Sequence, residues 1–80
     1  MKVLFYGRLA EAIGPELEVG VPPGCSIADL RDRLIAQRPD IEEVLRNRRA
    51  KACVADRLVP DDYPIGADET VEFLPPVSGG

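Results

Sequence analysis

The first eight residues have a hydrophobic pattern that predicts a β-strand. β-branched, aromatic and aliphatic side chains dominate residues 1–8, a composition typical of strands. Because side chains alternate across a strand, Val3 and Phe5 share one face, and Leu4 and Tyr6 share the other. Both faces are apolar, so we expect a central strand or a strand whose second face meets a partner.

A helix is the clearest element that the pattern predicts. Apolar side chains recur at helical spacing after residue 26, namely Ile27, Leu30, Leu34 and Ile35. Ser26 is a suitable N-cap, Asp29 follows three residues later, and Pro39 stops the hydrogen-bond ladder. Arg31 falls beside the apolar stripe, so we expect its stem to lie on the core and its charge to remain in water.

Weaker signals complete the order of elements. They predict a short helical turn or loop at 10–13, a strand at 17–21, a short helix from Asp40, two short strands at 52–55 and 58–59 around a turn at 56–57, and a last strand at 69–74. A crossover helix after an antiparallel hairpin allows a later strand to lie parallel to the first. We therefore predict an α+β domain over residues 1–74, a ubiquitin-like β-grasp with a mixed sheet covered on one face by a helix.

Composition and charge argue against several functions. The net charge of −4 disfavours a nucleic-acid surface and a polybasic membrane anchor. The chain has no run of about 18 apolar residues and no signal-peptide pattern, so we expect a cytoplasmic protein. Histidine is absent, a phosphate-binding glycine loop is absent, and Cys25 and Cys53 lack the spacing of a zinc site. We expect no bound metal or cofactor, no catalytic constellation, and structural positions for both cysteines.

The last six residues, 75–80, form a tail that we expect to be extended. Pro75 and Pro76 end the last strand because neither has an N–H to donate. Six residues at about 3.1 Å each would reach about 19 Å from the sheet. Gly79 and Gly80 have no Cβ, so they could thread a narrow tunnel into another protein's active site.

A carboxylate at the end of such a tail is a poor electrophile until one oxygen becomes a leaving group. Acyl adenylation by ATP achieves this, after which a sulfur or nitrogen nucleophile can take the acyl group. This chain has no phosphate-binding loop, so the activation would come from a separate enzyme.

The order of elements and the ending 73–80, FLPPVSGG, resemble the small subunit of molybdopterin synthase. The resemblance covers the whole chain, including the opening strand, the helix around Leu30 and the approach to the last strand at 68–71. The sulfur carrier of the thiamine pathway shares the fold and the Gly-Gly end, but usually lacks the Pro-Pro pair. Ubiquitin-like modifiers share less.

This resemblance implies a chemistry for the tail. Gly80 would be adenylated by a ubiquitin-activating-like adenylyltransferase that uses ATP, and then converted to a thiocarboxylate, with Gly79 allowing access. The tail would enter the large subunit of molybdopterin synthase, where catalysis occurs. Sulfur would pass to the pyranopterin substrate, cyclic pyranopterin monophosphate, in molybdenum cofactor biosynthesis. The family forms a heterotetramer of two large and two small subunits.

The exposed sheet face and the start of the tail are the expected partner-binding surface. It comprises Leu4, Tyr6, Leu58, Leu74, Pro75, Pro76 and Val77. Ordinary partial burial is the alternative explanation for the four residues on the sheet. Other functions also stay open at this point: a sulfur carrier for thiamine or cysteine synthesis, a protein modifier that forms isopeptide bonds with lysines, and an interaction domain whose tail has no chemical role.

Overall fold

The computed structural model describes residues 1–46 and 50–75. Its elements are β1 (Lys2–Phe5), α1 (Gly7–Ile13), β2 (Glu16–Glu18), α2 (Ile27–Gln37), the 3₁₀ helix η1 (Pro39–Ile41), α3 (Glu42–Arg46), β3 (Lys51–Val54), β4 (Arg57–Val59) and β5 (Val71–Leu74). No helix in this part of the chain is both long enough and apolar enough to cross a membrane.

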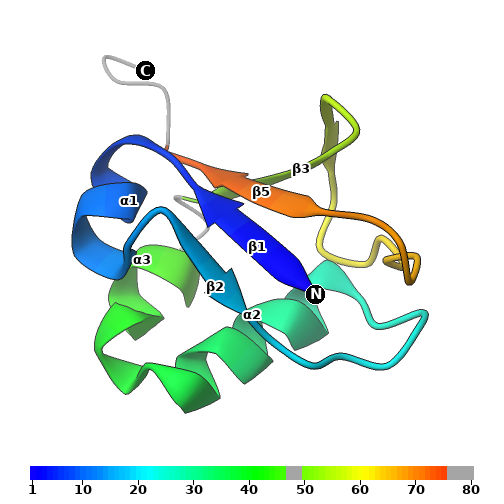
Figure 1. Cartoon of the computed structure of the whole chain (residues 1–80), viewed down its shortest axis with the longest axis horizontal. Coiled ribbons are helices and arrows are strands. Elements are labelled where there is room, and N and C mark those ends of the chain that lie inside the picture. The colour runs from blue at the N-terminus through cyan, green and yellow to red at the C-terminus, as the bar shows by residue number, and fades with distance from the viewer. Residues whose placement is uncertain (47–49, 76–80) are drawn as a thin grey trace.

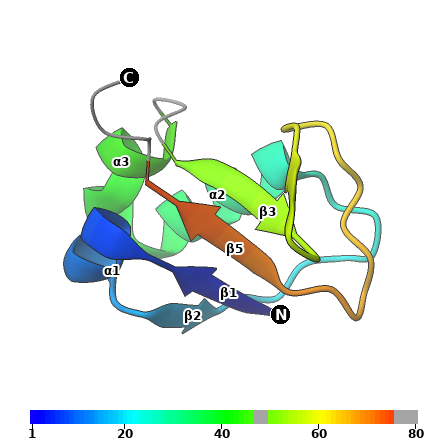
Figure 2. The same cartoon turned by 90° about the horizontal axis from the view of Figure 1, so that it is seen from above.

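Five strands form one mixed sheet in the order β2-β1-β5-β3-β4 (Figure 1). β1 pairs antiparallel with β2 and parallel with β5, while β3 pairs antiparallel with both β5 and β4. The first and last strands are therefore neighbours near the middle of the sheet. The helices lie on one side of it, as Figures 1 and 2 show. The predicted α+β arrangement is confirmed.

The helix α2 supplies much of the core. Ser26 caps it with a complete capping box: the Asp29 N–H donates to the Ser26 hydroxyl, and the Asp29 carboxylate accepts from the Ser26 N–H. The four apolar side chains of the predicted stripe are all buried. Against them pack the inward side chains of the sheet, where Phe5 and Phe73 stack with their ring centroids 5.8 Å apart.

Several boundaries differ from the sequence prediction. The expected turn at 10–13 is a seven-residue helix, α1, whose Leu9 and Ile13 are one helical turn apart and both buried. β2 occupies Glu16–Glu18 rather than 17–21. The hairpin turn is Ala55-Asp56 rather than 56–57, and both residues have positive φ, 52° and 64°, as a type I′ turn requires.

The expectation that the charge of Arg31 stays in water was wrong. Arg31 is 8% exposed, and its guanidinium donates to the carbonyl oxygens of Leu45 at 2.6 Å and Ala50 at 2.8 Å. It also pairs with Asp61 at 3.2 Å and lies over the Phe73 ring. The side chain is buried because these acceptors replace the water that a guanidinium would otherwise need.

Candidate functional site

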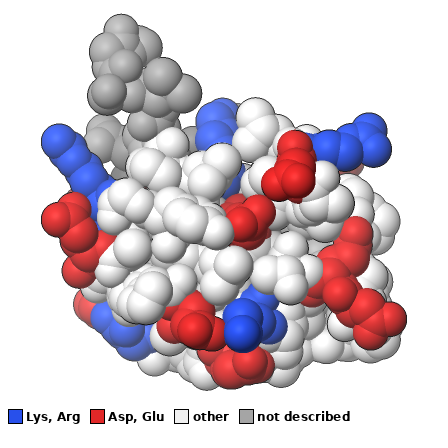
Figure 3. All heavy atoms as spheres, turned by 45° about the horizontal axis from the view of Figure 1, so that its top comes forward, with Lys and Arg blue, Asp and Glu red and all other residues white. Residues whose placement is uncertain are grey.

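The sheet face opposite the helices carries the candidate docking surface. Strand register places Leu4, Glu72, Cys53 and Leu58 side by side in one row across β1, β5, β3 and β4. Since neighbouring strands lie about 4.8 Å apart, this row spans about 14 Å. In Figure 3, uncharged side chains form a broad area of the surface, with charged side chains within it and around its margin.

The structure brings the four predicted sheet residues onto this face. Leu58 is 66% exposed and Tyr6 is 42% exposed, and they are the large exposed hydrophobic residues of the described chain. Leu4 and Leu74 are half-buried. Tyr6 caps α1 rather than belonging to β1, but its N–H still donates to the Phe73 carbonyl at 3.3 Å. We define these four residues as the sheet patch.

The start of the tail packs against Gly7, the first residue of α1. Pro75 lies so close to Gly7 that a Cβ added to Gly7 would be 2.9 Å from the proline Cγ. Gly7 also has a φ of +59°, a conformation that favours glycine. Sequence reasoning missed this role, because a lone glycine between a strand and a helix looks like an ordinary turn residue. The other predicted tail residues, Pro76, Val77, Gly79 and Gly80, lie outside the described residues.

Tyr6 of the sheet patch forms a pair with a neighbouring carboxylate, and sequence reasoning missed it as well. The Tyr6 hydroxyl donates to Oε2 of Glu72 at 2.6 Å. This hydrogen bond to the carboxylate raises the pKa of Tyr6 above its usual value, and the nearby charge of Asp56 acts in the same direction. The pair therefore presents a carboxylate held in one orientation by the Tyr6 hydroxyl, with Leu4 and Cys53 beside it.

Neither cysteine is prepared for nucleophilic chemistry. Burial raises the pKa of the Cys53 thiol, and the negative charges of Glu72 and Asp56 raise it further. Burial also raises the pKa of Cys25, so both thiols stay protonated at neutral pH. Among the described residues, no group of histidine, cysteine, aspartate and glutamate side chains could hold a metal ion.

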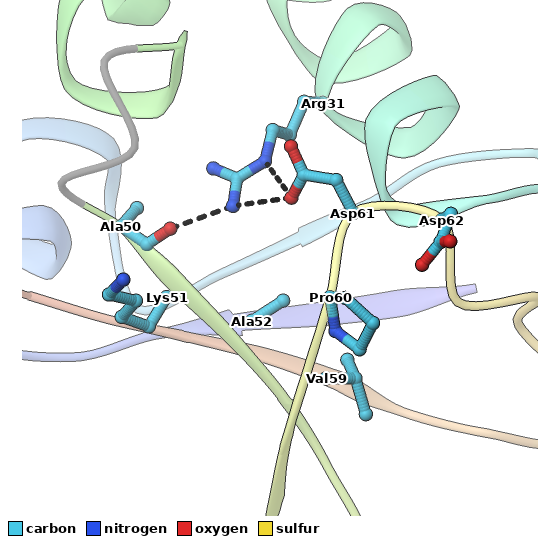
Figure 4. Close-up of a pocket in the computed structure, with 8 residues that line it drawn as sticks. All are labelled: Arg31, Ala50, Lys51, Ala52, Val59, Pro60, Asp61 and Asp62. Carbon is cyan, nitrogen blue, oxygen red and sulfur yellow. Dashed lines mark hydrogen bonds and ion pairs between the residues drawn. The ribbon is translucent and has the colours of Figure 1, made fainter.

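A hollow of about 480 Å³ lies between Arg31, β3 and the loop after β4 (Figure 4). Its polar lining includes Arg31, Lys51, Asp61 and Asp62. The guanidinium points at Asp61 and at the Ala50 carbonyl, which come from two different segments. The guanidinium already donates four hydrogen bonds to Leu45, Ala50 and Asp61, so Arg31 joins these segments to α2.

Comparison with known proteins supports the architecture. The crystal structure of H. volcanii small archaeal modifier protein 1 matches with a TM-score of 0.80 at 19% identity over 95% of each chain. A chain from the Helicobacter pylori complex of subunits 1 and 2 of molybdopterin-converting factor matches with a TM-score of 0.67 at 20% identity, over 99% of this chain and 96% of that chain. The domain is therefore a ubiquitin-like β-grasp, as predicted.

Sequence similarity shows the family. A model of the ThiS family matches residues 3–80. The Escherichia coli (strain K12) molybdopterin synthase sulfur carrier subunit is 30% identical over 80 residues, which cover 100% of this chain and 99% of that protein. The chain belongs to the ThiS family.

Proposed function

We propose that this chain is the sulfur-carrier subunit of a molybdopterin synthase. An adenylyltransferase would use ATP to convert the Gly80 carboxylate into an acyl adenylate with loss of pyrophosphate. A sulfur nucleophile would then displace AMP and leave a thiocarboxylate on Gly80. The large subunit would catalyse transfer of that sulfur to cyclic pyranopterin monophosphate, and this chain would contribute no catalytic side chain.

The observation that carries this proposal is the end-to-end similarity to the E. coli sulfur carrier, which extends through the Gly79-Gly80 end. The H. pylori complex of subunits 1 and 2 of molybdopterin-converting factor supports pairing of such a chain with a second subunit. We also propose that the synthase is a heterotetramer of two large and two small subunits.

The geometry of the described residues agrees with a donor tail. β5 pairs with β1 on one side and with β3 on the other. The tail therefore begins, after Leu74, at a strand that is hydrogen-bonded along both edges. The sheet patch includes Leu74, so it lies next to the point where the tail leaves the sheet. A partner that covers the patch would therefore also be placed beside the tail.

Intact-mass spectrometry tests the chemistry directly. The purified chain is incubated with the adenylyltransferase encoded in the same genome, ATP and a sulfur source. We expect the mass increase that results when one sulfur replaces one oxygen. Mixing the product with the large subunit and the pyranopterin precursor should yield molybdopterin. Deletion of Gly80 should abolish both signals while the melting temperature stays the same. Full activity of the deleted chain would refute the proposal.

A protein modifier is the second candidate function, because the H. volcanii modifier protein shares the fold. Adenylation of Gly80 would serve that function equally well, but the acyl group would then pass to a lysine amine. Expression of a tagged chain in its own organism distinguishes the two. Lysine-linked conjugates of higher mass, with normal molybdoenzyme activity after gene deletion, would favour the modifier.

A further inference from the structure

Glu72 occupies the centre of the surface that the proposed partner would cover. It is half-buried in β5, with Leu4 opposite it on β1 and Cys53 opposite it on β3. Tyr6 and Leu58 complete its apolar surroundings on this face. A carboxylate in this position is unusual, since the cores of protein interfaces are depleted in aspartate and glutamate.

The carboxylate depends on water while the face is open. Its two oxygens can accept about four hydrogen bonds, and within the described chain Glu72 receives one, from the Tyr6 hydroxyl at 2.6 Å. A partner lying on the sheet patch would remove the remaining water. A charge buried with a single hydrogen bond is strongly unfavourable unless the partner supplies a cation or further donors.

The surroundings of Glu72 favour a cation. It borders a hollow of about 420 Å³ whose other lining residues include Asp56, Asp68 and Glu69, and lysine and arginine are absent from the lining in the described chain. The ion pairs formed among residues 1–46 and 50–75 leave Glu72, Asp56 and Asp68 unpaired. The local field is therefore negative.

Neither lysine of this face forms an ion pair with Glu72 within the described residues. Lys2 pairs with Glu16 at 3.5 Å on the β2 side. Lys51 lies opposite Leu74, at the tail end of the sheet, rather than opposite Glu72. Glu69 differs from the other carboxylates, because the Tyr63 hydroxyl and the Gly66 N–H already bond to it.

Building on the proposed function, we infer that Glu72, oriented by Tyr6, is the polar anchor of the docking face and receives an arginine side chain of the large subunit. The planar guanidinium can donate two parallel hydrogen bonds to one carboxylate. Its remaining donors would face the acidic hollow beside Glu72. Tyr6 is then a positioning residue, because it fixes the carboxylate that the arginine meets.

Calorimetric titration of the separately purified large subunit with the full-length, unmodified chain tests this inference. Glu72→Gln keeps the size of the side chain and an acceptor for Tyr6, but removes the charge. We expect it to weaken binding about 30-fold or more, the lower end of the loss for a buried charge pair, and to reduce the salt dependence of the affinity. Tyr6→Phe should weaken binding less, and should have little further effect in the Glu72→Gln background.

Glu43→Gln is the matched control, since Glu43 is an exposed carboxylate on α3, among the helices. It should change the affinity less than twofold. Circular dichroism melting of each variant separates loss of binding from loss of fold. Glu72→Gln binding within twofold of the original chain, at unchanged salt dependence, would overturn this inference and leave the proposed function standing. Failure of the original chain to bind the large subunit would overturn both.

Discussion

Replacement of Gly7 by alanine should destabilise the domain more than the same change at other glycines. Gly7 has a φ of +59°, and left-handed backbone costs a residue with a Cβ about 1–2 kcal/mol. The new Cβ would also lie 2.9 Å from Cγ of Pro75, well inside the contact optimum of about 3.5–4.0 Å for two carbon atoms. Overpacking of this kind adds about 1–3 kcal/mol. The expected loss is therefore about 2–5 kcal/mol.

Urea denaturation with two control glycines measures this loss and separates its two causes. Gly24→Ala has the positive φ, +83°, without any atom within 4 Å of the new Cβ, and Gly20→Ala has neither feature. We expect Gly20→Ala to be nearly neutral and Gly24→Ala to lose only the conformational part. In a Pro75→Ala background the ring is gone, so Gly7→Ala should lose about 1–2 kcal/mol.

The comparison of these backgrounds decides whether Gly7 and Pro75 are coupled. A loss that is identical with and without the proline ring would refute the contact argument. A Gly7→Ala variant as stable as Gly20→Ala would refute the conformational argument too. For a domain of this size, a loss of 2 kcal/mol lowers the melting temperature by about 8–16 °C, so the effect is easily measured.

Three further outcomes are expected. Arg31→Met should lower the free energy of unfolding in urea by about 2–6 kcal/mol, because two backbone carbonyls lose their partner at about 1–3 kcal/mol each; a loss below about 1 kcal/mol would contradict the idea that Arg31 joins these segments. Leu58→Glu should leave the melting temperature unchanged, since this side chain is 66% exposed, but should abolish calorimetric binding of the large subunit. Hydrogen bonds from a backbone N–H and from Tyr63 lower the pKa of Glu69 below its usual 4.5. The ionised side chain therefore adds to the free energy of unfolding above the unfolded-state pKa, and this stabilisation is lost as the pH falls through the folded-state pKa. Glu69→Gln should therefore destabilise the domain at neutral pH and flatten the acid side of a stability–pH curve; an unchanged curve would exclude this role.

The features predicted correctly from the sequence are those with local signals. Ser26 and Asp29 are three residues apart and define the start of α2, and its apolar spacing identifies the buried face. The strand and helix order allowed a later strand to lie parallel to the first, and the structure shows that this strand is β5. The alternation in β1 likewise placed Leu4 on the face away from the core.

The features that were missed depend on residues far apart in the chain. The carbonyl acceptors of Arg31 are 14 and 19 residues away, and no side-chain pattern reports where a backbone oxygen will lie. Glu72 alternates with buried neighbours, which predicts only an outward direction, whereas its hydrogen bond to Tyr6 joins residues separated by 66 positions. The docking role of the sheet patch stays a prediction.

The position of β5 has a consequence for how the molecule is made. β5 lies between β1 and β3, so a nascent chain that stops before residue 71 leaves two strands without the neighbour that joins them. Such a fragment has no continuous sheet to cover its helices, and we expect proteases to degrade it. We therefore expect only chains synthesised past residue 74 to fold, so that Leu74, where the tail leaves the sheet, is in place before an activating enzyme meets the chain.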